Sequence, residues 1–85
     1  MTYNQLSIRA RFRPEIMERI LRVIRHRGFR VCVMNMVQPA ESEHVDLDLT
    51  VAGLRPVDGL SAQLSKVLDV VRIDVRPAAA RRVAT

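Results

Sequence analysis

The 85-residue sequence predicts one α+β domain in which strands and helices follow one another as strand, helix, strand, strand, helix, strand. Four strand-length apolar segments, three of them alternating with polar residues, indicate the strands. Two longer segments with apolar residues at three- and four-residue spacing indicate amphipathic helices. This order is that of the split β-α-β motif of ferredoxin-like folds. We therefore expect a four-stranded antiparallel sheet in the order 4-1-3-2, with both helices on one face.

The first half of the chain contains a half-buried strand and a helix. Residues 6–13 alternate, and the apolar members are Leu6, Ile8, Ala10 and Phe12, which places Phe12 in register with the core. Pro14 suits the first position of a helix, and the helix is predicted to extend to Arg27. Its apolar stripe comprises Ile16, Met17, Ile20, Val23 and Ile24. Gly28 should end it in the left-handed conformation that glycine tolerates.

The second predicted strand, residues 29–37, is apolar on both faces. Val31, Val33 and Val37 would share one face, and Cys32, Met34 and Met36 the other. In the order 4-1-3-2 this strand lies at a sheet edge, where unpaired backbone groups invite another strand. We interpret it as a dimer or partner interface formed by Phe29, Val31, Cys32, Val33, Met34, Asn35 and Met36. A loop that covers the edge is the alternative.

The remaining elements follow the same logic. A third strand, residues 45–51, buries one face and ends at Gly53, and a helix begins at Pro56. The helix stripe comprises Val57, Leu60, Leu64, Val67 and Leu68, and the last strand would bury Val71, Ile73 and Val75. On the helix-free face, Arg9 and Arg11 would meet carboxylates of the neighbouring strands, namely Asp46, Asp48 and Asp74. These arginines and Arg13 could equally contact a partner.

Composition limits the function classes. The net charge of +5 would suit an acidic partner or nucleic acid. RNA-binding domains with this element order stack bases on strand aromatics, and the third strand has none, so RNA binding is a weaker alternative. Cys32 is the single cysteine, which excludes an internal disulfide and suits a reducing compartment. No secretory signal or spanning segment is apparent, and we expect a cytoplasmic protein without membrane contact.

Motifs for chemistry are missing from the sequence. Neither nucleotide-binding glycine motifs nor a nucleophile elbow occurs. His26 and His44 lack metal-ligand spacing. We expect no catalytic residue, no metal site and no cofactor in this chain.

Three segments carry a resemblance to a known family. ARFRPEIMERILRVIRHRGFRVCVMNM, LTVAG and QLSKVLDVVRIDV resemble the small subunits of bacterial acetolactate synthase (acetohydroxyacid synthase), of the short isozyme II type, and their looser pattern is that of the ACT domain. The resemblance implies a non-catalytic regulatory subunit that binds and activates a large subunit carrying thiamine diphosphate, magnesium and FAD. That enzyme serves valine, leucine and isoleucine biosynthesis. It also implies side-by-side dimers through the second strand.

The resemblance further singles out residues 12–15. Feedback-regulated relatives hold the carboxylate of valine there with an Asn and a Gly, and these positions fall on Phe12 and Glu15. Pro14 removes an N–H donor, and Glu15 adds a negative charge. We therefore expect a degenerate effector loop, Phe12, Arg13, Pro14 and Glu15, that does not bind valine.

The domain bounds follow from these segments. Residues 3–76 would form the ACT domain and residues 77–85 a flexible C-terminal tail. A second function remains open, a stand-alone ACT dimer that senses an amino acid or other small molecule for a different enzyme.

Overall fold

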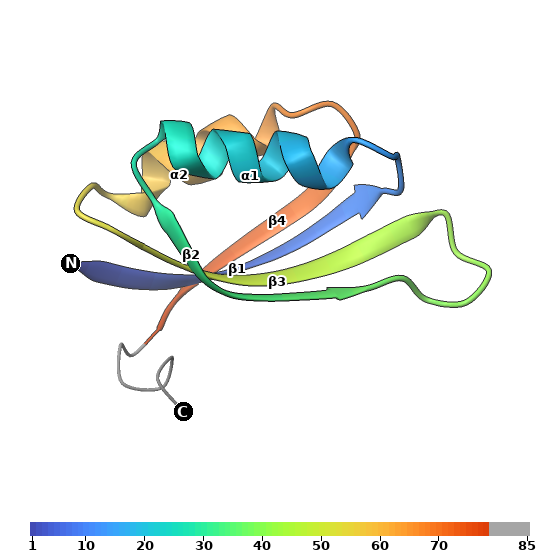
Figure 1. Cartoon of the computed structure of the whole chain (residues 1–85), viewed down its shortest axis with the longest axis horizontal. Coiled ribbons are helices and arrows are strands. Elements are labelled where there is room, and N and C mark those ends of the chain that lie inside the picture. The colour runs from blue at the N-terminus through green and yellow to red at the C-terminus, as the bar shows by residue number, and fades with distance from the viewer. Residues whose placement is uncertain (79–85) are drawn as a thin grey trace.

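A computed structural model, which describes residues 1–78, shows a two-layer α+β sandwich (Figure 1). Its elements are β1 (Thr2–Arg11), α1 (Ile16–His26), β2 (Arg30–Val37), β3 (His44–Gly53), α2 (Val57–Ser65) and β4 (Val70–Pro77). The sheet order is β2-β3-β1-β4, with every neighbouring pair antiparallel. Both helices lie on one face of the sheet. The predicted fold class and the predicted order 4-1-3-2 are confirmed.

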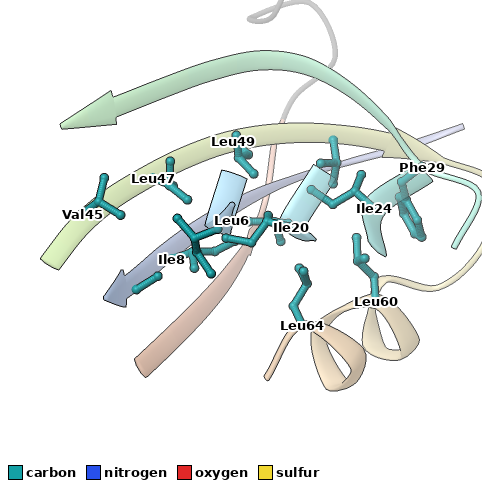
Figure 2. Packing of buried hydrophobic residues seen from close by; sticks show 13 residues of the cluster. Leu6, Ile8, Ile20, Ile24, Phe29, Val45, Leu47, Leu49, Leu60 and Leu64 are labelled. Carbon is teal, nitrogen blue, oxygen red and sulfur yellow. The ribbon is translucent and has the colours of Figure 1, made fainter. Parts of the chain in front are cut away.

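The core lies between the helices and the central strands. Alternate residues of β1 and β3 point toward α1 and α2, and the large residues that meet there are fully buried: Leu6, Ile8, Ile16, Ile20, Ile24, Val45, Leu47, Leu49, Val51, Leu60 and Leu64 (Figure 2). Burial of a large aliphatic side chain contributes about 1.5–3 kcal/mol. The central pair β1–β3 is therefore the anchor on which both helices pack.

The C-terminus of α1 closes as a Schellman motif. Gly28 has φ +84°, and its N–H donates to the carbonyl oxygen of Arg25 at 3.0 Å. The N–H of Phe29 donates to the carbonyl oxygen of Ile24 at 3.0 Å. Both bonds satisfy carbonyl groups that the helix end would leave unpaired, and glycine takes the left-handed position without strain. The predicted helix stop at Gly28 is confirmed.

The start of α1 differs from the prediction. The helix begins at Ile16, and Pro14 lies in the turn before it. β1 ends at Arg11, so Phe12 leaves the strand and its side chain is exposed instead of joining the core. The N–H of Phe12 donates to the carbonyl oxygen of Glu43 at 2.8 Å. The expected core position of Phe12 is therefore wrong, because alternation continues only while the strand does.

Two further apolar residues lie outside the core. Leu68 is exposed because α2 ends at Ser65, and the helical spacing that would turn it inward does not extend that far. Val71 is exposed because the β1–β4 register shifts at this point: Arg9 is paired with Arg72 and Ala10 with Val70, which leaves Val71 as the extra residue of a bulge. Val70 packs against the core in its place, with Ile73 and Val75.

A second bulge changes the faces of β2. The register with β3 shifts between Val31 and Val33, with Cys32 as the extra residue. On the helix side, Val31, Met34 and Met36 lie opposite Val51, Leu49 and Leu47; on the helix-free side, Val33 and Val37 lie opposite Thr50 and Asp46. The expected grouping of Val31 with Val33 is wrong, since an inserted residue reverses the alternation.

Strands β1 and β4 extend further toward the chain termini than predicted. β1 begins at Thr2 and β4 includes Pro77, and the N–H of Ala78 donates to the carbonyl oxygen of Tyr3 at 3.0 Å. Pro77, the first residue of the expected tail, therefore belongs to the sheet, and Ala78 is bonded to β1. The remainder of that tail, residues 79–85, lies outside the described residues.

A close approach at the end of β3 gives a test of the packing. A Cβ at Gly53 would lie 2.6 Å from Cδ2 of the buried Phe29 ring. G53A should therefore reduce the free energy of unfolding by about 1–3 kcal/mol, the usual cost of overpacking, as measured by urea denaturation. Gly59 in α2 has open space around such a Cβ, and the control G59A should add about 0.5–1 kcal/mol. Equal stability of G53A and the parent would contradict the close packing.

Candidate functional site

The edge strand β2 carries an uncovered apolar surface. Four of its side chains are 43–52% exposed, namely Val33, Met34, Met36 and Val37. Met34 and Met36 lie on the helix side of the sheet, opposite Leu49 and Leu47. Helix α1 covers the two leucines but does not extend over the two methionines. No described segment covers this edge, because β2 is the last strand of the sheet on that side. These four residues and Asn35 are called the β2 edge below.

Some of the predicted interface residues lie on the exposed edge of the sheet, and others lie toward the core. Val33, Met34, Asn35 and Met36 are exposed on the β2 edge, and Val31 and Cys32 are partly buried. Phe29, which was also predicted to lie at the interface, is a core residue at 4% exposure and is not part of the exposed edge. Its ring packs over Gly53 instead. Val37 was missed as a site residue, although its place in the run VCVMNMV indicates a second exposed valine.

The helix-free face is polar and carries ion pairs between side chains. Arg9 donates from Nε and Nη2 to the two carboxylate oxygens of Asp46 at 2.9 and 3.2 Å. Ser7 Oγ donates to Asp48 at 3.0 Å. The contact between Arg9 and Asp46 confirms the predicted pairing across β1 and β3. Arg11 lies opposite His44 and has no ion-pair partner within residues 1–78.

Arg72 and Asp74 are paired within β4, with Nε and Oδ2 2.9 Å apart. Asp74 therefore bonds to its own strand, and the expected contact of Asp74 with an arginine of β1 is not formed among the described residues. Exposed pairs of this kind contribute little to stability. They keep both sets of charges on the solvent face.

The loop between β1 and α1 has its polar groups engaged. Arg13 Nε lies 3.8 Å from Asp69 Oδ2, and its carbonyl oxygen accepts from the N–H of Ile16 at 3.1 Å. Glu15 accepts from Arg19 Nη2 at 3.2 Å. Pro14 has no N–H. At the start of α1, Pro14 therefore lacks an N–H and the N–H of Ile16 is used, and the carboxylate of Glu15 lies beside them.

Within residues 1–78, no three His, Cys, Asp or Glu side chains gather in a metal-binding group. The helices in that range are also too short and too polar to cross a bilayer. The features described so far are an apolar edge, an ion-paired sheet face and a loop held by hydrogen bonds.

Comparison with known proteins decides the family. The ACT domain family matches residues 12–73. The sequence is 47% identical, over 75 residues, to the acetolactate synthase isozyme 2 small subunit of Escherichia coli K12, and the match covers 88% of this chain and 86% of that subunit. This chain belongs to the ACT-domain family of acetolactate synthase small subunits. The relative from Shigella flexneri with the same description matches equally well.

Solved structures share the fold of this ACT domain. The acetolactate synthase small subunit of Thermotoga maritima superimposes with a TM-score of 0.74 at 19% identity; the match covers 91% of this chain and 47% of that one. The ACT domain of GTP pyrophosphokinase from Chlorobium tepidum superimposes with a TM-score of 0.70 at 15% identity and covers 88% of this chain and 97% of that one. The expected family and fold are confirmed together.

The ion pair on the sheet face of this ACT domain gives a pH-dependent test. The hydrogen bond from Arg9 lowers the pKa of Asp46, and the positive charges of Arg9 and His44 act in the same direction. A carboxylate whose pKa is lower in the folded state stabilises the fold above its unfolded value, about 3.9. That stabilisation is lost as the pH falls through the lower folded value.

R9Q should therefore move the titration midpoint of Asp46, followed by NMR of its carboxyl carbon, upward toward the ordinary aspartate value. The stability difference between R9Q and the parent should vanish at acid pH. R55Q, which removes an exposed arginine from the loop after β3, should leave the midpoint unchanged. An unchanged midpoint in R9Q would show that the bond is absent in solution.

Proposed function

We propose that this chain is a regulatory subunit that binds the catalytic large subunit of acetolactate synthase and raises its activity. The 47% identity to an acetolactate synthase isozyme 2 small subunit carries the proposal, because it extends over most of both chains. The exposed apolar side chains of the β2 edge support it, since a binding subunit needs exposed surface. Thiamine diphosphate, magnesium and FAD would belong to the large subunit, and the reaction would serve branched-chain amino acid synthesis.

The β2 edge supports a homodimer as part of this function. Symmetric antiparallel pairing of two β2 edges requires a two-fold axis perpendicular to the sheet, which keeps both helical layers on the same face. In such a pairing, the numbers of any two residues that face each other add up to the same even total. Centred on Asn35, the pairing sets Met34 against Met36 of the second copy and Val33 against Val37.

Centring on a neighbouring residue matches the side chains less well. An axis at Met34 would set Val33 against Asn35 and involve the bulge at Cys32. An axis at Met36 would set Asn35 against Val37 and Met34 against Gln38. Asn35 is also the middle of the five residues, 33–37, that keep an uninterrupted register with β3. The axis at Asn35 therefore buries all four exposed apolar side chains of the β2 edge together.

The β1–α1 loop supports insensitivity to valine. A valine carboxylate would need free N–H donors at the start of α1. Pro14 supplies none, the N–H of Ile16 is donated to Arg13, and the carboxylate of Glu15 would repel the ligand. We infer that activation by this subunit persists in the presence of valine.

Addition of this chain to its cognate large subunit should raise acetolactate formation to a saturating level, and valine should leave the activated rate unchanged. Isothermal titration should detect no valine binding to the chain alone. E15G should bind valine more tightly than the parent does, because it removes both the charge and the side chain. E15Q, which removes the charge alone, separates the two effects. Activation that valine reverses would refute the degenerate loop.

Failure to activate would favour the alternative function, a stand-alone ACT dimer that senses a small molecule for another enzyme. In that case a screen of amino acids by thermal shift should find a stabilising ligand. A chain that neither activates the large subunit nor binds a ligand would contradict both functions.

The dimer is tested by charge substitution on the β2 edge. M34K with V37K places a lysine on each side of the paired strands, and the dissociation constant of the dimer, from light scattering at several concentrations, should rise at least about tenfold. L54K, at an exposed residue outside the edge, should leave it unchanged. In a C32S background, N35C should form a crosslink across the axis under oxidation. Absence of the crosslink would rule out the axis at Asn35.

A further inference from the structure

An open hollow of about 410 Å³ lies beside the point where α1 ends and β2 begins. Its lining side chains are three apolar residues and two arginines, namely Leu21, Arg25, Phe29, Arg30 and Val31. Arg30 and Val31 are the first residues of β2, the last strand of the sheet on that side. The hollow therefore adjoins the free edge of the sheet. It is called the β2-start hollow below.

The charge around the β2-start hollow is not balanced. No residue that lines it is acidic. Arg25 and Arg30 are both exposed, and neither forms an ion pair within residues 1–78. A carboxylate that reached this place would therefore gain cationic partners, and hydrogen bonds between guanidinium and carboxylate groups are among the stronger ones in proteins.

The turn between β2 and β3 carries groups that complement this hollow. Two small apolar residues, Pro39 and Ala40, are followed by Glu41, which is exposed and has no ion-pair partner in the described part of the chain. The turn is ordered, since the N–H of Ser42 donates to the carbonyl oxygen of Pro39 at 3.1 Å. Gln38 Nε2 also donates to the carbonyl oxygen of Ser42, at 3.5 Å. The turn, residues 38–43, thus presents an apolar and then an acidic group on a held backbone.

Within one copy, the β2-start hollow and the turn lie at opposite ends of β2 (Figure 1). β2 has eight residues, and at about 3.3 Å per residue they separate the two features by about 25 Å. The turn therefore cannot cover the hollow of its own chain.

The antiparallel pairing of two β2 edges would bring the turn of one copy to the hollow of the other. With the axis at Asn35, the first residues of one β2 run beside the last residues of the second. Continued past the strand end, the same count sets Pro39 of the second copy beside Val31 and Ala40 beside Arg30. Glu41 then follows at the level of Phe29. Strands rise equally per residue, so the turn arrives where the hollow lies.

We propose that the turn of each copy docks over the β2-start hollow of the other copy, with Glu41 paired to Arg25 and Arg30. This inference rests on the dimer that forms part of the proposed function. Pro39 and Ala40 would cover the apolar side chains of the hollow, which a free anion would leave exposed to water. Because the dimer is two-fold symmetric, the contact occurs twice and both copies contribute equally.

Charge reversal on each side of the contact tests the proposal. R30E and E41R should each raise the dissociation constant of the dimer about tenfold, because attraction becomes repulsion at two equivalent contacts. A mixture of the two variants restores opposite charges at both contacts. The mixed dimer should therefore form with nearly the dissociation constant of the parent. Sedimentation equilibrium of the full chain at low salt measures all three, and high salt should reduce the differences.

Matched controls reverse charges away from the β2 edge. R76E in β4 and D58R in α2 change exposed residues. Each should dimerise as the parent does, and their mixture should show no preference for the mixed dimer. Melting temperatures close to that of the parent would show that R30E and E41R fold.

The outcomes separate this inference from the proposed function. A parent chain that stays monomeric at every concentration refutes the dimer and this contact with it, although activation of the large subunit would still support the regulatory role. If the parent dimerises and N35C crosslinks, but R30E and E41R match the parent, the turn docks elsewhere. Weaker association of both variants without recovery in the mixture would place Arg30 and Glu41 in separate contacts and also overturn the proposal.

Discussion

Two short helices must cover one face of a four-stranded sheet, and this constraint shapes the surface of the whole domain. α1 has 11 residues and α2 has 9, which at 1.5 Å per residue gives helices of about 16 and 14 Å. They shield the central strands β1 and β3, whose inward residues are fully buried. Cover is incomplete at the flanks, where β2 leaves two methionines half exposed.

The incomplete cover connects the fold to the proposed function. A domain that buried all of its apolar side chains would have little surface with which to bind another chain. Here four exposed apolar side chains lie together on the β2 edge. This strand is the last of the sheet on its side, and it would suit pairing with a second copy, as proposed above.

The β1–α1 loop is the place where the proposed loss of valine sensing would originate. A carboxylate ligand needs unused N–H donors and no negative charge at the start of α1. Pro14 supplies no donor and Glu15 supplies a negative charge, and the bonds of Phe12 and Arg13 fix the loop to Glu43 and Asp69. We infer that the loop has a structural role. Regulation by this subunit would then reside in association with the enzyme.

Local pattern alone determined most of the architecture. The element order, the sheet order and the stop at Gly28 were predictable, because period-2 and period-3.6 apolar spacing and helix capping are short-range effects. The ion pair between Arg9 and Asp46 also followed, once the order placed β1 beside β3. The start of β1 at Thr2 was missed because Asn4 is a polar residue on the buried side, where the pattern expects an apolar one.

The tertiary structure decided which apolar residues face solvent. The bulges at Cys32 and Val71 depend on strand register, which sequence spacing does not reveal. Leu68 and Phe12 were expected inside because their elements were predicted to be longer than they are. Phe29 was expected at the interface, but its ring lies in the core, in the space that Gly53 leaves free. Sequence determined which elements form and in what order they pair, whereas register and element length determined which surfaces remain for a partner.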